Sequence, residues 1–132
     1  MGPRPILIVD DEPIVRESIR DWLVDAGYRV ETAETGEQAL QLLQNGGFGV
    51  MILDVRLPGR TGISVLREVR EKKPDLKTII ITAYPSSDLT VEALRLGALD
   101  YLIKPIVPDD LERLVRDAVH RYEFENQGGG QR

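Results

Sequence analysis

The sequence has no cysteine and a single histidine, His120. Disulfide bonds and thiolate metal sites are therefore excluded, and so is a metal site built from several histidines. No apolar run is long enough to cross a membrane, and the four apolar residues 6–9 are too few for the core of a signal peptide. A soluble, cytoplasmic protein is expected. His120 lies in a charge-rich stretch and is expected at the surface.

Basic residues are outnumbered, with 17 Lys and Arg against 22 Asp and Glu, and the formal net charge is −5. Because a nucleic-acid surface needs a basic patch, direct nucleic-acid binding by this segment is disfavoured. The chain also lacks the Gly-x-x-x-x-Gly-Lys and Gly-x-Gly-x-x-Gly motifs, so nucleotide binding has no support. A length of 132 residues, 42% of them hydrophobic, suits one globular domain.

Two short apolar runs each end on acids. Residues 6–9 lead into Asp10 and Asp11, and residues 50–53 lead into Asp54. A continuous apolar run of this length predicts a strand that is buried on both faces. An ionised carboxylate at the end of such a strand is costly unless something compensates its charge. The two runs therefore predict one acidic site shared by the ends of two buried strands.

Five segments with strand character alternate with five helical patterns. Strands are expected over 6–9, 28–33, 50–54, 77–82 and 100–103, and helices over 13–26, 35–44, 62–72, 86–96 and 108–122. On the first helix, Val15, Ile19, Trp22, Leu23 and Ala26 are expected on the inner face. The alternation predicts an α/β fold, with a parallel sheet covered on both faces through right-handed crossovers.

Polar residues of compatible chemistry follow these strands. Asp10, Asp11, Asp54, Thr82 and Lys104 all lie at or just past the carboxyl ends of strands, where sheets of this class bind ligands. Three close carboxylates repel one another, and a divalent cation that prefers oxygen, Mg2+ above all, relieves that repulsion. Mg2+ keeps several water ligands and so leaves room for a phosphoryl group, which a lysine and a threonine hydroxyl also suit. A carboxylate can itself be phosphorylated, giving an acyl phosphate.

Each of these residues also has an ordinary structural interpretation when it is taken alone. Asp10 and Asp11 could cap a helix and fill its first turn, Thr82 could be a plain strand residue, and Lys104 could lie in an exposed loop. Tyr101 could be half-buried packing. The functional interpretation is preferred because the acids and the lysine fall at the same edge of one sheet.

Four motifs resemble the receiver domain of bacterial two-component response regulators. They are Ile-Val-Asp-Asp-Glu at 8–12, Leu-Asp-Val-Arg-Leu-Pro at 53–58, Ile-Thr-Ala at 81–83 and Asp-Tyr-Leu-Ile-Lys-Pro at 100–105. Their order and spacing extend the resemblance over residues 5–122. It implies a flavodoxin-like (CheY-like) doubly wound (βα)5 fold with strand order 2-1-3-4-5. Residues 1–122 would form the receiver domain, and 123–132 a linker-like or frayed tail.

The resemblance also implies a phosphorylation site with a bound Mg2+. Asp54 is expected to accept a phosphoryl group from a sensor histidine kinase or a phosphotransfer protein. Asp11 would bind Mg2+ directly, Asp10 through water, Asp54 through its carboxylate, and Arg56 through its backbone carbonyl.

The other residues of the resemblance concern the response to phosphorylation. Thr82 and Lys104 would contact the phosphoryl oxygens, and Tyr101 would pack inward when Thr82 moves toward them. The peptide bond between Lys104 and Pro105 is expected to be cis. Arg56 and Tyr84 lie two positions beyond Asp54 and Thr82, and both are bulky, which predicts slow loss of the phosphoryl group.

The function that follows is a phosphorylatable signalling switch rather than an enzyme with turnover beyond its own phosphorylation and dephosphorylation. The helix over 86–96 has more apolar residues than one inward face needs, so this helix, the strand over 100–103 and the last helix are expected to form a switchable partner or homodimer surface. The run at 100–105 resembles receivers attached to transcriptional activators.

Two other functions are weighed against this one. An aspartate-nucleophile phosphatase or phosphotransferase would want a second acid two residues after the nucleophile, where this chain has Arg56. A flavodoxin-like cofactor binder is the other, but acids at the strand ends would repel a flavin phosphate.

Overall fold

Strands and helices alternate along the whole of residues 4–128, which the computed structural model describes. The strands are β1 (Ile6–Val9), β2 (Val30–Ala33), β3 (Val50–Asp54), β4 (Lys77–Thr82) and β5 (Asp100–Ile103). The helices are α1 (Pro13–Asp25), α2 (Gly36–Asn45), α3 (Gly62–Lys72), α4 (Asp88–Arg95) and α5 (Pro108–Gly128). All strand pairs are parallel, and the order β2-β1-β3-β4-β5 confirms the predicted topology.

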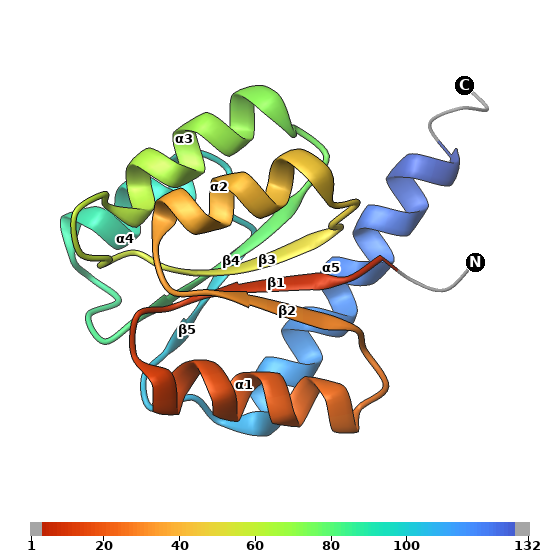
Figure 1. Ribbon diagram of the computed structural model, residues 1–132, viewed down its shortest axis with the longest axis horizontal. Helices are drawn as coiled ribbons and strands as arrows, with labels where there is room; N and C mark the ends of the chain where they lie inside the picture. The colour runs from red at the N-terminus through yellow and green to blue at the C-terminus, as the bar shows by residue number, and fades with distance from the viewer. Residues whose placement is uncertain (1–3, 129–132) are drawn as a thin grey trace.

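The helices cover both faces of this sheet. Figure 1 shows α2, α3 and α4 on one face and α1 and α5 on the other. Because successive strand residues point to opposite faces, Leu7 and Val9 of β1 enter the core under α2 and α3, whereas Ile6 and Ile8 enter the core under α1 and α5. Both cores need apolar side chains, which is why every residue of β1 and β3 is buried.

Local signals in the sequence set the helix ends. The side chains of Thr35, Thr61 and Ser87 each accept the backbone N–H three residues later, so α2, α3 and α4 begin with the capping expected of these residue types. At the end of α1, Gly27 has φ of 98°, a left-handed conformation that suits glycine. The helix ends therefore set the positions at which the chain turns back toward the sheet.

Three details of the expected elements are wrong. β2 begins at Val30 instead of residue 28, because the Tyr28 N–H is taken by the Leu23 carbonyl at the end of α1. Trp22 is 37% exposed, and Ala26 is exposed as the residue that caps α1. The buried face of α1 is therefore narrower than predicted, and its first turn places the side chain of Arg16 in the interior.

The last helix continues past residue 122, where the tail is expected to begin. Its final turns are held against the sheet by an ion pair between Lys77 and Glu125 at 2.6 Å and by the Arg4 guanidinium, which lies 5.8 Å from the Tyr122 ring centre. Residues 123–128 are thus helical rather than linker-like. Residues 129–132 lie outside the described residues, and the domain boundary at 122 stays a prediction.

None of the helices within residues 4–128 combines the length and the apolar character that a membrane span requires.

The start of α3 leaves no space beside the end of β3. A Cβ at Gly62 would lie 2.3 Å from the backbone oxygen of Asp54 and 2.7 Å from the Cα of Val55. Since backbone atoms on both sides must move, we expect Gly62→Ala to lower the free energy of unfolding by about 1–3 kcal/mol, measured by urea denaturation.

Gly36→Ala is the matched control, because Gly36 holds the same first position of α2 and its Cβ would meet a side-chain carbon of Val65 at 2.6 Å. A side chain adjusts more easily than backbone, so this variant should lose less stability. An equal or smaller loss for Gly62→Ala would contradict the assignment.

Candidate phosphoacceptor site

Two buried carboxylates lie side by side at the carboxyl edge of the sheet. Asp54 ends β3, and Asp10 follows β1, whose last residue Val9 pairs in register with Leu53. Asp10 is fully buried and Asp54 is 5% exposed. Among the described residues, Asp10, Glu12 and Asp54 form a group in which one carboxylate oxygen from each lies within 4.8 Å of the other two. The predicted convergence of the two strand ends is therefore present.

The same local turn follows each of three neighbouring strands. In each case a side-chain oxygen of the strand-end residue accepts the backbone N–H of the residue two positions later. The pairs are Asp10 with Glu12, Asp54 with Arg56, and Thr82 with Tyr84, each at 2.9 Å. Such turns are typical of Asp and Thr side chains. In both acids the turn uses Oδ1, so Oδ2 is left to face the centre of the site.

Lys104, which directly follows β5, supplies the positive charge. Its Nζ atom lies 2.8 Å from Asp54 Oδ2, 2.6 Å from Glu12 Oε1 and 3.2 Å from Asp10 Oδ2. Burial acts to lower the pKa of this ammonium, but the hydrogen bonds that it donates to Asp54 and Glu12 and the nearby negative charges outweigh burial, so its pKa is raised. The lysine therefore stays charged and compensates part of the acidic cluster.

Asp10 is the carboxylate that is least well compensated. Its Oδ2 atom is buried and has no hydrogen-bond partner, because the Lys104 ammonium at 3.2 Å is paired with it by charge without hydrogen-bond geometry. Burial is the largest effect on the pKa of Asp10 and raises it, with a further rise from the charge of Asp54, against the opposing effects of the Glu12 N–H and the Lys104 ammonium. A buried carboxylate oxygen that lacks a hydrogen-bond partner and lies beside two further carboxylates fits a hard divalent cation such as Mg2+.

Asp11 and Glu12 differ from the expected assignment. Asp11, the residue expected to bind Mg2+ directly, is exposed and lies outside the group of three carboxylates, and its role stays a prediction. Glu12 has no predicted role, yet it is part of that group and bonds Lys104. The spacing relates only the backbone N–H of Glu12 to that of Arg56, and the position of the Glu12 carboxylate depends on Lys104, 92 positions further along the chain.

The remaining predicted residues lie around this cluster. Thr82 is 2% exposed, and its hydroxyl contacts the Tyr84 N–H and the hydroxyl of Thr90 on α4. Tyr101 is partly buried and packs against the core under α2, α3 and α4. The bond between Lys104 and Pro105 is cis, which confirms the expectation.

A cation–π contact lies at the rim of the site. The Arg56 guanidinium is 5.2 Å from the centre of the Tyr84 ring, and both side chains are exposed. Their backbone N–H groups are the ones that bind Asp54 and Thr82, so the pair is held directly beside both residues.

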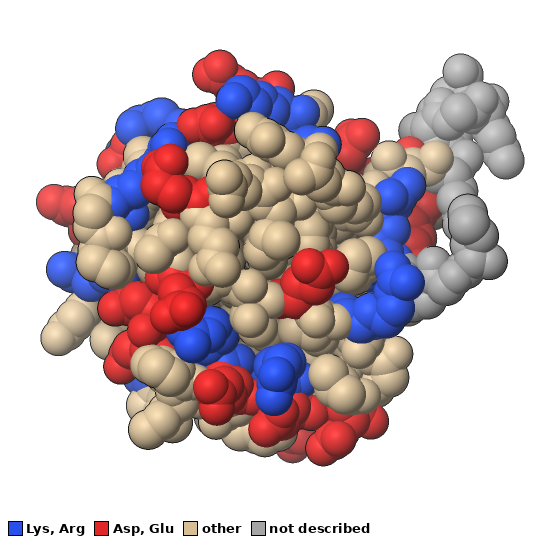
Figure 2. Space-filling view, viewed as in Figure 1, with Lys and Arg blue, Asp and Glu red and all other residues tan. Residues whose placement is uncertain are grey.

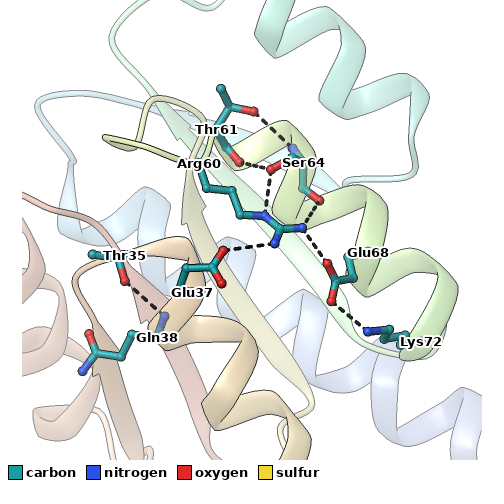
Figure 3. Close-up of polar contacts among 8 residues, drawn as sticks. All are labelled: Thr35, Glu37, Gln38, Arg60, Thr61, Ser64, Glu68 and Lys72. Atoms are coloured by element: carbon teal, nitrogen blue, oxygen red, sulfur yellow. Dashed lines mark hydrogen bonds and ion pairs between the residues drawn. The ribbon is translucent and has the colours of Figure 1, made fainter.

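The loop after β3 is tied to two helices through Arg60. Figure 3 shows its guanidinium between Glu37 of α2, at 3.1 Å, and Glu68 of α3, at 2.5 Å. Its Nε atom also donates to the Ser64 hydroxyl, and Lys72 bonds Glu68 from the other side. Because this loop carries the backbone of Arg56, the network restricts the segment that closes one side of the site.

The surface charge agrees with this arrangement. Figure 2 shows acidic atoms grouped on the left of the view, where the carboxyl ends of the strands lie in Figure 1, with basic atoms directly beside them.

The structure is a doubly wound α/β fold with buried carboxylates and a lysine at the strand ends, and comparisons with known proteins identify the family. Residues 6–116 match the model of the response regulator receiver domain, and the chain belongs to this family.

Curated relatives are longer than this chain. It is 42% identical over 106 residues to the alginate biosynthesis transcriptional regulatory protein AlgB of Pseudomonas aeruginosa, which covers 80% of this chain and 24% of that protein. It is 39% identical over 118 residues to the transcriptional regulatory protein ZraR of Escherichia coli, covering 86% and 26%. The chain thus spans about a quarter of the length of these relatives.

Solved structures agree with the fold. A CheY-like receiver domain protein from Methanospirillum hungatei has a TM-score of 0.89 at 32% identity, covering 94% of this chain and 99% of that one. NtrX from Brucella abortus has a TM-score of 0.91 at 27% identity, covering 99% of this chain and 30% of that one.

The Oδ2 atom of Asp10, which lacks a hydrogen-bond partner, predicts that Mg2+ stabilises the folded protein. A ligand that binds only the folded state adds RT ln(1 + [L]/Kd), or about 1.4 kcal/mol at ten times Kd. We expect Mg2+ to raise the Tm of the wild-type protein and to have little effect on Asp10→Asn, measured by thermal unfolding. Asp117→Asn, which alters an exposed acid paired with Arg121, should respond like the wild type. An undiminished Mg2+ effect in Asp10→Asn would contradict this assignment.

Proposed function

We propose that this chain is a phosphoacceptor switch in which Asp54 receives a phosphoryl group from the phosphohistidine of a sensor kinase or phosphotransfer protein. The observation that carries the proposal is the environment of Asp54 Oδ2, which lies 2.8 Å from the Lys104 ammonium and beside two further carboxylates. One carboxylate oxygen of Asp54 attacks phosphorus as the bond to the histidine nitrogen breaks, so an acyl phosphate forms and the kinase histidine is released. Membership of the receiver-domain family supports this proposed chemistry.

The surrounding residues have separate roles in this step. Mg2+, when bound, offsets the negative charge of the acids and of the incoming phosphoryl group. Asp10 and Asp54 would hold the ion, with Asp11 and the Arg56 carbonyl as the further ligands expected from the family resemblance. The Lys104 ammonium exchanges Glu12 for a phosphoryl oxygen, which is possible because Glu12 is exposed and can return to water.

Next to the site, this chain has an apolar surface on which a kinase would dock. Ile14 on α1 is 81% exposed, and Trp22 lies on the same helix. These two residues border a groove that is also lined by Lys104, Pro105 and Ile106. A partner helix bound there would bring its phosphohistidine to the edge where Asp54 lies.

The readout surface is proposed on α4, β5 and α5. Val91 and Leu94 of α4 and Ile103 of β5 are exposed apolar side chains, and Tyr101 lies half-buried in the same strand. The phosphoryl group on Asp54 would carry about −1.5 to −2 of charge in place of the single negative charge of the carboxylate, and Thr82 and Tyr101 would pass this change to the surface. A second copy of this chain, in a homodimer, or an output domain is proposed to bind this surface. Since AlgB and ZraR are named as transcriptional regulators, transcriptional control is the proposed output, and the cytoplasmic location stays a prediction.

The first test is phosphorylation itself. Incubation with acetyl phosphate and Mg2+ should add the mass of one phosphoryl group to the intact protein and should not do so for Asp54→Asn. Asp25→Asn, an exposed acid on α1, is the matched control and should be phosphorylated normally. Sustained turnover of a phosphomonoester, or modification that survives in Asp54→Asn, would overturn the proposal.

The cation–π pair at the rim predicts a long-lived acyl phosphate. We expect Arg56→Ala combined with Tyr84→Ala to speed the loss of the phosphoryl group several-fold, because water gains a path to Asp54. The decay is measured by intact mass after the phosphodonor is removed. Arg20→Ala, which changes an exposed arginine on α1, should leave the rate unaltered. A decay rate in the double variant equal to that of the wild type would argue against this role.

A further inference from the structure

Thr90 is a fully buried polar residue on α4 that the phosphoacceptor chemistry does not use. Its Oγ1 atom donates to Thr82 Oγ1 at 3.1 Å and lies equally close to the carbonyl oxygen of Tyr84. The hydroxyl of Ser87, the cap of α4, is also 3.1 Å away. The hydroxyl of Thr82 is therefore engaged on the side of α4, with hydrogen bonds to Thr90 and to the Tyr84 N–H.

The hydrogens in this group can be counted. A hydroxyl carries one hydrogen, so Thr90 serves either Thr82 or the Tyr84 carbonyl at any moment. The Tyr84 carbonyl already accepts the Ser87 N–H at 3.0 Å and has a second lone pair to offer. If Thr82 turns away, the Thr90 hydroxyl keeps a partner in the Tyr84 carbonyl, and the N–H of the exposed residue Tyr84 gives up its bond to the Thr82 hydroxyl. The group therefore has two hydrogen-bonded arrangements.

We propose that Thr90 is a positioning residue that holds the Thr82 hydroxyl toward α4 and competes with the phosphoryl group on Asp54 for it. The proposal rests on the function proposed above, in which Thr82 contacts a phosphoryl oxygen. Thr90 stabilises the unphosphorylated arrangement by about one hydrogen bond. In turning toward the phosphoryl group, the Thr82 side chain carries its oxygen away from α4 and so breaks this bond, and the Thr90 hydroxyl then turns to the Tyr84 carbonyl.

The same contacts couple the site to the surface of α4. The backbone N–H of Thr90 donates to Ser87 Oγ at 3.3 Å, so Thr90 belongs to the hydrogen bonds that cap the helix. Val91 and Leu94, which are exposed on the outside of α4, follow within one turn. A change at the Thr82 hydroxyl therefore reaches the first turn of the helix that carries the proposed readout surface.

The substitution Thr90→Val separates the effect of losing the hydroxyl from the effect of changing the size and branching of the side chain. Thr90→Val keeps the branched shape, leaves the Thr90 N–H bond to Ser87 in place, and removes only the hydroxyl. Because Thr82 is then freed from α4, we expect beryllofluoride, a phosphoryl mimic, to bind about two- to tenfold more tightly in the presence of Mg2+, measured by isothermal titration calorimetry. Thr90→Ser restores the hydroxyl and should bind as the wild type does.

Thr78→Val is the matched control. Thr78 is also a buried threonine, near the other end of β4, and its hydroxyl has no hydrogen-bond partner. Its replacement should leave beryllofluoride affinity unchanged. In a Thr82→Val background, Thr90→Val should also have no effect, because the competition acts only through the Thr82 hydroxyl.

The possible failures are distinguishable. A wild-type protein that binds beryllofluoride, with Thr90→Val of unchanged or weaker affinity, overturns the role of Thr90 and leaves the phosphoacceptor function standing. A gain in affinity that persists in the Thr82→Val background also overturns it. A wild-type protein that binds no beryllofluoride in Mg2+ overturns the proposed function, and the role of Thr90 with it.

Discussion

The main physical constraint on this structure is that two carboxylates are buried side by side where the adjacent parallel strands β1 and β3 end. Asp10 and Asp54 are carried out of β1 and β3 into a site with little access to water, and their mutual repulsion must be offset. Lys104 offsets part of it from β5, which is two strands away from β3. The Oδ2 atom of Asp10 is left without a hydrogen-bond partner, and the proposed binding of a divalent cation rests on this feature.

The fold holds these groups in place by a rule that repeats. Each strand-end side chain accepts the N–H two residues further on, so the acids and Thr82 are fixed by backbone as well as by the sheet. The loop that follows Asp54 is fixed further by Gly62, which leaves no space for a side chain, and by the ion pairs of Arg60. In the proposed function, the change of charge at Asp54 would act through the threonine pair of β4 and α4, where the Thr90 hydroxyl has two partners at 3.1 Å.

Much of this arrangement could be predicted from the sequence. Apolar runs that end on acids predict buried strands with Asp10 and Asp54 at one edge, and the alternation of strands and helices predicts a parallel sheet. Trp22 shows where such patterns fail, since helical periodicity marks a face but cannot tell how much of its width another element covers. Glu12 shows a second limit, because its part in the cluster depends on how Lys104 reaches across the strand ends.

The sequence by itself determined the elements, their order and the chemical types gathered at the strand ends, because periodicity, capping residues and apolar runs act over a few neighbouring positions. Only the tertiary structure decided which of those groups meet. Thr82 and Thr90 are eight positions apart, and their hydrogen bond exists because α4 folds back over the end of β4. Lys104 reaches Asp54 across fifty positions of chain for the same reason: contacts between elements depend on how the layers pack, which no local pattern records.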